Sequence, residues 1–236
     1  MPPVVPGDYH IIVRTDIRNN VRESNETNNS GTSAETIAVD VIELTLGVPY
    51  SSQLSTGAEH YYKVTVGAGE DMLVTLDSAS TTSANELYVR YEGMPDRGYY
   101  DFLYNAPFLP DQEVLVPGTQ AGTYYILVRG DAVPDSPAGY TITAQLLEFG
   151  IRSLFPTYGG DTGTVTLSIS GGKFEEGISA LLRIAGHPEI HAERVDLENS
   201  TTLWARFDLN QAPLGAYDLL LTNPDGSSAL GSGIFT

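Results

Sequence analysis

Apolar and polar residues alternate along many short stretches of this chain, and no stretch keeps an amphipathic period of 3.6 residues. Before residue 149 the stretches that show this alternation lie at 61–66, 72–76, 87–91, 113–116, 123–128 and 140–144. After it they lie at 164–169, 180–184, 193–197, 202–208, 215–222 and 233–236. A period of two indicates strands with one face toward a core. We therefore predict an all-β chain with minimal helix.

The first 42 residues follow a different pattern. Residues 8–14 and 34–41 read as strands, and a polar stretch dense in Asn separates them. Two strands do not build an independent core. We expect residues 1–42 to be a partial β module.

Composition supports the same fold class. The chain holds 14 Tyr, 24 Gly and 14 Pro, and the Gly and Pro residues punctuate the apolar stretches. Aromatic and β-branched residues favour pleated, half-buried surfaces. Many short strands joined by turns are typical of sandwiches. We predict two of them, at 43–148 and 149–236.

The net charge of the chain limits which classes of molecule it is expected to bind. The net charge is −18, from 30 acidic and 12 basic residues. Such a field repels phosphate backbones and anionic membrane surfaces, and it raises the local concentration of cations. We therefore expect no nucleic acid partner, and calcium is the cation that oxygen-rich acidic loops would take.

Several common features are absent from the sequence. There is no Cys, so disulfides and thiolate chemistry are excluded. No apolar run is long enough to span a bilayer. The segment 1–6 lacks the basic and apolar parts of a secretory signal, and we expect the chain to be a piece of a longer polypeptide.

Residues 5–42 contain a sequence motif with Asp16, Asn20, Glu23 and Glu26, embedded in Asp-x-x-x-Asn-Val-x-Glu-x-Asn-Glu-x-Asn-Asn. With the strand that precedes it, this motif resembles the last third of a CARDB domain, a bacterial module related to cell adhesion. The upstream strands of that fold are missing from the match.

Residues 43–148 resemble a bacterial pre-peptidase C-terminal (PPC) domain over their whole length. The features of this resemblance are a Tyr-Tyr-Lys-Val strand at 61–64, a Gly-Ala-Gly turn at 67–69, and strands at 86–91 and 122–128. The resemblance implies a jelly-roll-like sandwich of the kind appended to secreted peptidases. Some members of this family bind collagen or calcium, but no residue of this sequence warrants transferring collagen binding.

Residues 149–236 are similar to an IPT/TIG-type immunoglobulin-like domain. The opening strand at 151–156, the Gly-Gly-Lys-Phe turn at 171–174 and the turn at 223–226 account for this similarity. Together the three resemblances imply a segment of a large bacterial protein that is secreted or displayed at the cell surface.

The stretch 16–29 offers a candidate calcium site. Asp16, Asn20, Glu23 and Glu26 lie in one loop, and carboxylate and amide oxygens are the ligands that calcium prefers. The alternative is a purely structural turn, because Asn and Asp side chains bond nearby backbone groups and tolerate left-handed conformations. We favour the turn.

Asp131 and Asp135 form a weaker candidate for cation binding. They lie on one acidic loop, where two carboxylates could approach the same ion. We favour a solvated hairpin tip here, because turns select such residues.

An aromatic segment around the loop after residue 91 is the candidate ligand-binding surface. Its members are Tyr91, Tyr99, Tyr100, Phe102 and Tyr104. Rigid amphipathic rings on a loop can form a platform for a sugar or a peptide. The alternative, which we favour, is that the loop folds back over the sandwich and the rings close its open end. The single Trp, Trp204, is predicted to lie in the core of the last sandwich.

No catalytic motif is present. The sequence has no Gly-x-Ser-x-Gly elbow and no His-Glu-x-x-His. We therefore predict a non-catalytic segment that serves as spacer, adhesion or ligand-presenting module, requires no cofactor, and is stiffened by calcium if the acidic loops bind it. Its partners would be a protein or polysaccharide ligand and the neighbouring domains. The alternatives are an accessory substrate-binding region of a secreted peptidase or glycosidase, or a hydrolase with a His–carboxylate–Ser cluster.

Overall fold

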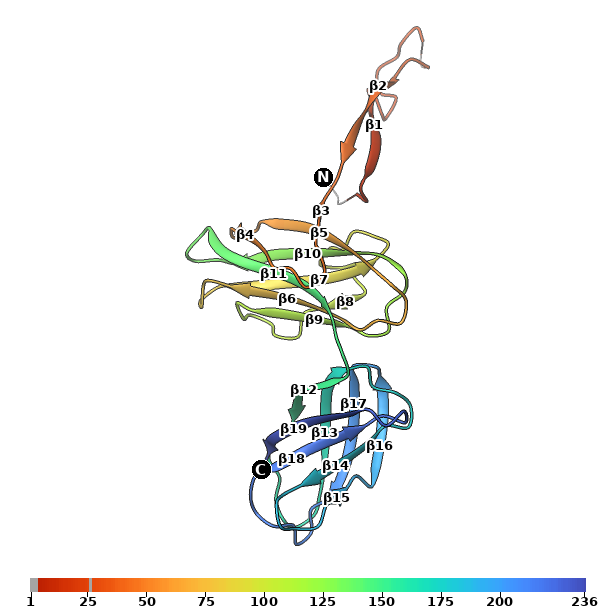
Figure 1. Cartoon of the computed structure of the whole chain (residues 1–236). Coiled ribbons are helices and arrows are strands. Elements are labelled where there is room, and N and C mark those ends of the chain that lie inside the picture. Colours follow the sequence, from red (N-terminus) through yellow and green to blue (C-terminus); the bar gives the residue numbers. More distant parts are fainter. Residues whose placement is uncertain (1–3, 26) are drawn as a thin grey trace.

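The computed structural model describes residues 4–25 and 27–236. Its described residues form 19 strands and no helix, so the all-β prediction is confirmed. None of them forms a helix of the length and hydropathy needed to cross a membrane. Figure 1 shows a projecting hairpin, a central sandwich and a C-terminal sandwich following one another along the molecule.

The hairpin pairs β1 (Gly7–Arg14) with β2 (Ser30–Val39) in antiparallel fashion. The register shifts between His10 and Ile12, where β2 carries the extra residues of a bulge. Every residue of β1 is exposed, and the hairpin contributes nothing to either hydrophobic cluster of the described residues.

The central sandwich has two sheets. One has the order β3-β5-β10-β7-β8 and the other β4-β11-β6-β9. The strands of the first sheet are β3 (Ile42–Glu43), β5 (Glu59–Val66), β10 (Gly122–Ala132), β7 (Ala84–Tyr91) and β8 (Phe102–Leu103). Those of the second are β4 (Tyr50–Leu54), β11 (Ala138–Leu146), β6 (Met72–Ser78) and β9 (Gln112–Val116). Inward residues such as Tyr62, Val74, Ile126 and Ile142 fill the core between the sheets.

The C-terminal sandwich also has two sheets, each of four strands, in the orders β12-β13-β17-β16 and β15-β14-β18-β19. The first contains β12 (Gly150–Phe155), β13 (Thr164–Gly172), β17 (Thr202–Asp208) and β16 (Arg194–Asn199). The second contains β15 (Ile190–His191), β14 (Ser179–Arg183), β18 (Tyr217–Thr222) and β19 (Ser228–Phe235). Leu167, Phe207, Leu219 and Phe235 belong to a core cluster separate from that of the central sandwich.

The prediction that Trp204 lies in the core is wrong. Leu203 and Ala205 are fully buried, whereas Trp204 is 43% exposed and its indole N–H donates to Glu198 at 3.0 Å. Successive side chains of a strand point to opposite faces, so only one of the two sets can be internal. Leu203, Ala205 and Phe207 form the inward set, which leaves the larger Trp ring outside.

Several strand limits also differ from the prediction. The last strand begins at Ser228 instead of residue 233, and β2 begins at Ser30 instead of residue 34. Both extensions are rich in Ser and Gly and give no sustained alternation of apolar and polar positions. They are strands because the partner strand supplies backbone hydrogen bonds.

Candidate functional site

The aromatic segment that follows β7 divides into packed and exposed rings. Tyr91, Phe102 and Tyr104 pack against the central hydrophobic cluster. Tyr100 is half-buried with its ring centre 5.1 Å from that of Tyr88, and Tyr99 is 61% exposed. The five rings do not all face solvent together, and binding of a ligand to them stays a prediction.

The exposed ring of Tyr99 is held by a cation. The guanidinium carbon of Arg90 lies 3.6 Å from the centre of the Tyr99 ring, which is cation–π geometry. Arg90 also donates to the carbonyl oxygen of Met94 at 3.1 Å, and Met94 itself is buried. These contacts tie the loop after β7 to its own sheet.

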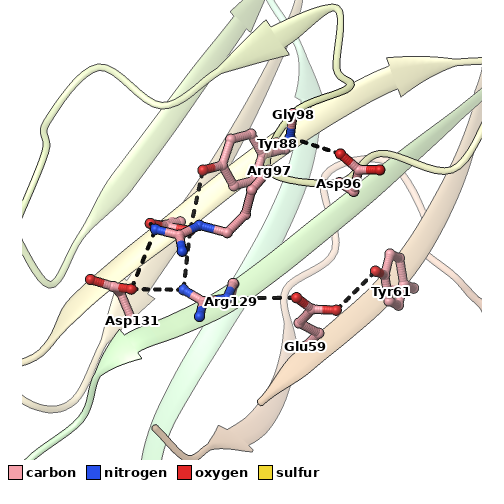
Figure 2. Close-up of polar contacts among 9 residues, drawn as sticks. Glu59, Tyr61, Tyr88, Asp96, Arg97, Gly98, Arg129 and Asp131 are labelled. Carbon is pink, nitrogen blue, oxygen red and sulfur yellow. Dashed lines mark hydrogen bonds and ion pairs between the residues drawn. The ribbon is translucent and has the colours of Figure 1, made fainter. Parts of the chain in front are cut away.

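A charged network continues this attachment across the outer face of the sheet (Figure 2). Glu86 is 5% exposed, and its two carboxylate oxygens accept from Arg97 at 2.7 Å and from Arg129 at 3.4 Å. Arg129 also contacts Asp131 at 2.7 Å and Glu59 at 3.6 Å. Arg97 comes from the loop and the other four residues from strands β5, β7 and β10, so the network fastens the loop down.

Two partly buried tyrosines of this face, Tyr61 and Tyr88, donate hydrogen bonds to carboxylates of the network. Burial, with the nearby charge of Glu86, raises the pKa of Tyr88 well above its ordinary value. Burial and the Glu59 carboxylate raise the pKa of Tyr61 in the same direction. Both phenols stay protonated as hydrogen-bond donors, to Glu86 at 3.2 Å and to Glu59 at 3.1 Å. The Glu86 and Glu59 carboxylates are thus bound by these phenols as well as by guanidinium groups.

Asp131 and Asp135, the weaker cation candidates, have separate partners. Asp131 lies between Arg129 at 2.7 Å and Arg97 at 3.5 Å. Asp135 accepts from the hydroxyl of Thr82 at 3.5 Å. Two guanidinium groups beside Asp131 repel a metal cation. Asp131 is thus part of an ion-pair network, which the expectation of a solvated hairpin tip did not include.

The loop between β1 and β2 uses its first carboxylate for the backbone. Asp16 has a φ of 39°, and its two oxygens accept from the N–H groups of Asn20 at 2.7 Å and Val21 at 2.9 Å. These are the contacts of the structural turn weighed against calcium. Of the other candidate ligands, Asn20 and Glu23 are exposed, and Glu26 lies outside the described residues.

Within residues 4–25 and 27–236, no three His, Asp or Glu side chains come together in an arrangement that could hold a metal ion. Calcium binding in this loop or at Asp131 and Asp135 stays a prediction.

A groove of about 430 Å³ opens where the hairpin joins the central sandwich. Its walls include Asp40 and Ile42 from the connection, and Glu59, His60 and Tyr61 from β5. The buried phenol of Tyr140 lies 2.8 Å from Nδ1 of His60, one of the residues that line the groove, and also bonds Tyr62. Burial lowers the pKa of His60, so the neutral imidazole is favoured.

Asp71 forms the centre of the joint between the two sandwiches. Its side chain has no exposed surface. Oδ1 accepts from the backbone N–H of Gly118 at 2.8 Å and from the hydroxyl of Ser200, and Oδ2 accepts from the backbone N–H of Lys173 at 2.6 Å. Gly118 belongs to the central sandwich, whereas Lys173 and Ser200 belong to the C-terminal one. The buried Asp71 carboxylate therefore accepts hydrogen bonds from both sandwiches.

Other contacts surround this carboxylate. Nζ of Lys173 contacts Glu70 at 2.6 Å and the carbonyl oxygen of Gly69 at 3.0 Å. Arg152 and Glu113 form a second ion pair across the joint, at 2.9 Å.

The connecting segment 147–149 is itself packed into the joint. The N–H of Leu147 donates to the carbonyl oxygen of Asp71 at 2.8 Å, and the ring of Phe149 meets that of Phe174 edge to face. A Cβ on Gly172 would lie 2.7 Å from Cβ of Leu147, so this close approach requires glycine.

Reasoning from sequence missed Asp71, Glu86 and the His60–Tyr140 pair. A charged residue inside an apolar strand, as in Asn85-Glu86-Leu87, is a signal for a buried ion pair. Asp71 directly precedes the apolar strand 72–76, which marks it as a residue of a strand end. Its partners are 47 to 129 residues away, and no local pattern identifies them.

Comparisons with known proteins give weak structural similarities. No family model matches the chain, and no curated protein matches it. One similar solved structure is a pre-peptidase C-terminal domain of a collagenase from Bacillus anthracis. It has 14% identity and a TM-score of 0.36, and the match covers 44% of this chain and 94% of that one.

Two further structures match over a longer part of the chain. A structure named as a putative secreted protein from Eubacterium rectale matches at 11% identity over 83% of this chain and 81% of that one, with a TM-score of 0.30. A DUF4785 family protein from Legionella pneumophila matches at 10% identity over 80% of this chain and 64% of that one, with a TM-score of 0.26. At these TM-scores the similarities assign neither a family nor a ligand. The CARDB and IPT/TIG resemblances stay predictions.

Proposed function

We propose that this chain is a non-catalytic spacer segment of an extracellular bacterial protein, in which two β-sandwiches are locked end to end. A spacer has to hold its neighbours at a fixed separation, and the joint around Asp71 supplies the required stiffness. Linked domains move relative to one another by default unless the interface between them is extensive. Here a buried carboxylate with three donors, two ion pairs and a packed linker replace a flexible connection.

The alternative role, an accessory substrate-binding region of a secreted hydrolase, needs a free binding face. Most rings of the aromatic segment are engaged with their own sandwich, and the charged groups beside them are paired. This arrangement favours a structural role for the loop and supports the spacer.

Distance measurement between the sandwiches tests the proposal. Because the chain has no Cys, Gln53→Cys and Asn210→Cys, both at exposed positions, allow clean spin labelling. We expect one narrow distance distribution by double electron–electron resonance, and a broad one when Asp71→Ala is added. Asp77→Ala, an exposed carboxylate of the same sandwich, is the matched control. A broad distribution in the parent chain would refute the spacer role.

A further inference from the structure

The loop of residues 104–111, which connects β8 to β9, exposes two large apolar side chains. Phe108 is 83% exposed and Leu109 is 53% exposed, and we call these two residues the apolar tip. The loop belongs to the central sandwich, so described parts of the chain flank it on both sides. Exposed apolar residues are ordinary on protein surfaces, so exposure alone does not make the tip a contact site.

The backbone of the tip favours glycine at the position of Phe108. The N–H of Leu109 donates to the carbonyl oxygen of Ala106 at 3.3 Å, which leaves Pro107 and Phe108 as the two central residues of a turn. Phe108 has a φ of 66°. Turns with proline first and a positive φ second take glycine there by preference, because a Cβ strains that conformation. The Phe108 ring strains its backbone and adds nothing to the central core, which points to a role outside the fold.

Buried amide side chains hold the turn in one position. Nε2 of Gln112 donates to the carbonyl oxygens of Ala106 at 2.7 Å and of Leu109 at 2.8 Å. Nδ2 of Asn85 donates to the carbonyl oxygen of Pro110 at 2.7 Å. Gln112 and Asn85 are each only 3% exposed. A loop that is already ordered loses little conformational entropy on binding, so the apolar tip is pre-organised for contact with a partner.

A groove of about 250 Å³ adjoins the apolar tip. Its walls include the carboxylate residues Asp77, Asp111 and Glu113, and none of the described residues that line it is basic. Ala106 is also a wall of this groove, and its carbonyl oxygen closes the turn that carries the tip. We call this groove the acidic groove, and it is continuous with the tip through Ala106.

Two of the three carboxylates in the acidic groove have no cationic partner among the described residues. Glu113 is paired with Arg152 at 2.9 Å. Asp111 accepts from the backbone N–H of Ser78 at 2.8 Å through Oδ1, and forms no ion pair. The side chain of Asp77, the residue before Ser78, has neither a hydrogen bond nor an ion pair with any described residue. The groove therefore presents two neighbouring negative charges that a cation from outside would neutralise.

Charge decides which molecule fits this surface. A second copy of a chain with a net charge of −18, a nucleic acid and an anionic membrane are all repelled by it. A basic segment of another protein is attracted. Arginine and lysine each join an apolar stem to a cationic head, so they match an apolar tip that adjoins an acidic groove.

We propose that the apolar tip and the acidic groove together dock a segment of a partner protein in which arginine or lysine alternates with apolar residues. The cationic head lies at the Asp77 and Asp111 carboxylates, and the apolar residues cover Phe108 and Leu109. A guanidinium over the face of an aromatic ring adds further attraction. This docking surface goes beyond the spacer role and does not rest on the Asp71 joint.

Titration with a defined peptide tests the docking. The probe is the capped peptide Gly-Arg-Leu-Arg-Leu-Arg-Gly, and the matched control peptide carries Gln in place of each Arg. In ¹⁵N–¹H correlation spectra of the whole chain, we expect the probe at millimolar concentration to shift the amides of residues 75–78 and 105–113, and the control peptide to leave them in place. Added salt should weaken the binding, because exposed charges are screened.

Two substitutions separate the tip from the groove. Phe108→Gly suits the positive φ, so the urea midpoint should not fall, whereas the dissociation constant of the probe should rise about fivefold or more. Asp77→Asn removes a carboxylate without a described partner, and should raise the constant about threefold with an unchanged midpoint. Phe155→Ala and Glu176→Gln, at exposed positions of the C-terminal sandwich, are the matched controls and should leave the constant unchanged.

Other occupants of the surface would give different results. Shifts of the 105–113 amides with protein concentration alone would assign the tip to a second copy of the chain. Binding of phosphatidylcholine vesicles that Phe108→Gly abolishes would assign it to a lipid surface. Either result would overturn the proposal, and so would a probe that shifts none of these amides or shifts all acidic surfaces alike. Equal binding of the probe by the parent and Phe108→Gly would exclude the tip.

Discussion

The two joints of this chain are built from different parts. Between the sandwiches, the Asp71 carboxylate is fully buried and accepts three hydrogen bonds. Between the hairpin and the central sandwich, β3 pairs with β5 over only two residues, and Lys63 and Asp40 form an ion pair at 2.9 Å. The Asp40 side chain is 74% exposed.

The burial of each polar contact determines how much it stabilises its joint. An exposed ion pair is screened by water and salt and adds little. A buried acceptor whose donors have no other partner is costly to remove, because each donor is then left unsatisfied. We therefore expect the C-terminal joint to be stiff and the N-terminal one to be compliant. The following experiments, ordered from the largest expected effect, test that contrast.

Asp71→Ala should break the stiff joint. Three donors lose a charged acceptor, and we expect the chain to lose about 3 kcal/mol of unfolding free energy. The single Trp204 reports on the C-terminal sandwich, whereas far-UV circular dichroism reports on all strands. In urea, the two transitions should coincide in the parent and separate in the variant. Coincident transitions at unchanged midpoints in Asp71→Ala would show that the carboxylate does not couple the sandwiches.

Lys173→Ala should loosen the same joint less. The substitution removes the contacts of Nζ with Glu70 and with the carbonyl oxygen of Gly69, but keeps the backbone N–H that donates to Asp71. Because this ion pair is partly exposed, we expect a loss of about 1 kcal/mol in urea unfolding. The backbone φ of 56° is equally unfavourable for Lys and for Ala, so backbone strain cancels. A loss as large as that of Asp71→Ala would contradict the ranking by burial.

His60→Gln should change how stability depends on pH at the compliant joint. His60 faces the phenol of Tyr140, beside Tyr62, and shares its groove with the Asp40 and Glu59 carboxylates. Burial lowers the folded-state pKa of His60 below its ordinary value of 6.5, so the unfolded chain binds more protons. This contribution is complete above pH 6.5 and is lost as the pH falls through the unfolded-state value toward the lower folded-state one.

The measurement is the thermal midpoint of parent and His60→Gln between pH 5 and 8. We expect the parent to lose stability on acidification more steeply than the variant. His191→Gln, at an exposed position, is the matched control. Parallel curves for parent and His60→Gln would show that the imidazole is not desolvated in the folded chain.

Asp40→Ala should have the smallest effect on stability and a visible effect on motion. The hydrogen bond from Lys63 holds the pKa of Asp40 below its ordinary value of 3.8, so the contact is complete above that pH and is lost as the pH falls through the depressed value. We expect an unchanged urea midpoint and larger-amplitude motion of the β1 and β2 amides in ¹⁵N relaxation at pH 7. Unchanged relaxation would mean that the backbone pairing of β3 alone orients the hairpin.

Individual residues show which structural features a local sequence pattern predicts and which it does not. The alternation in residues 202–208 predicts a strand correctly, but not which side of it faces the core, and the expectation for Trp204 failed for that reason. Which of the two alternating sets of side chains faces the core depends on the elements that pack against the strand. In the aromatic segment, the residue types indicate a loop that contacts its surroundings, whereas the packing of Phe102 and Tyr104 depends on where β8 adds to the sheet.

The all-β class, the positions of most strands and the lack of known catalytic motifs can be predicted from the sequence, because these depend on alternation, turn residues and spacing within a few positions of the chain. The joint at Asp71, the Glu86 network and the outward place of Trp204 are visible only in the folded chain. Each of these depends on groups that are distant in sequence and meet once the sheets have formed. Asp71 and Asp40 are the same residue type in the sequence. Whether the carboxylate is buried depends on the hydrogen-bond donors that the folded chain places around it.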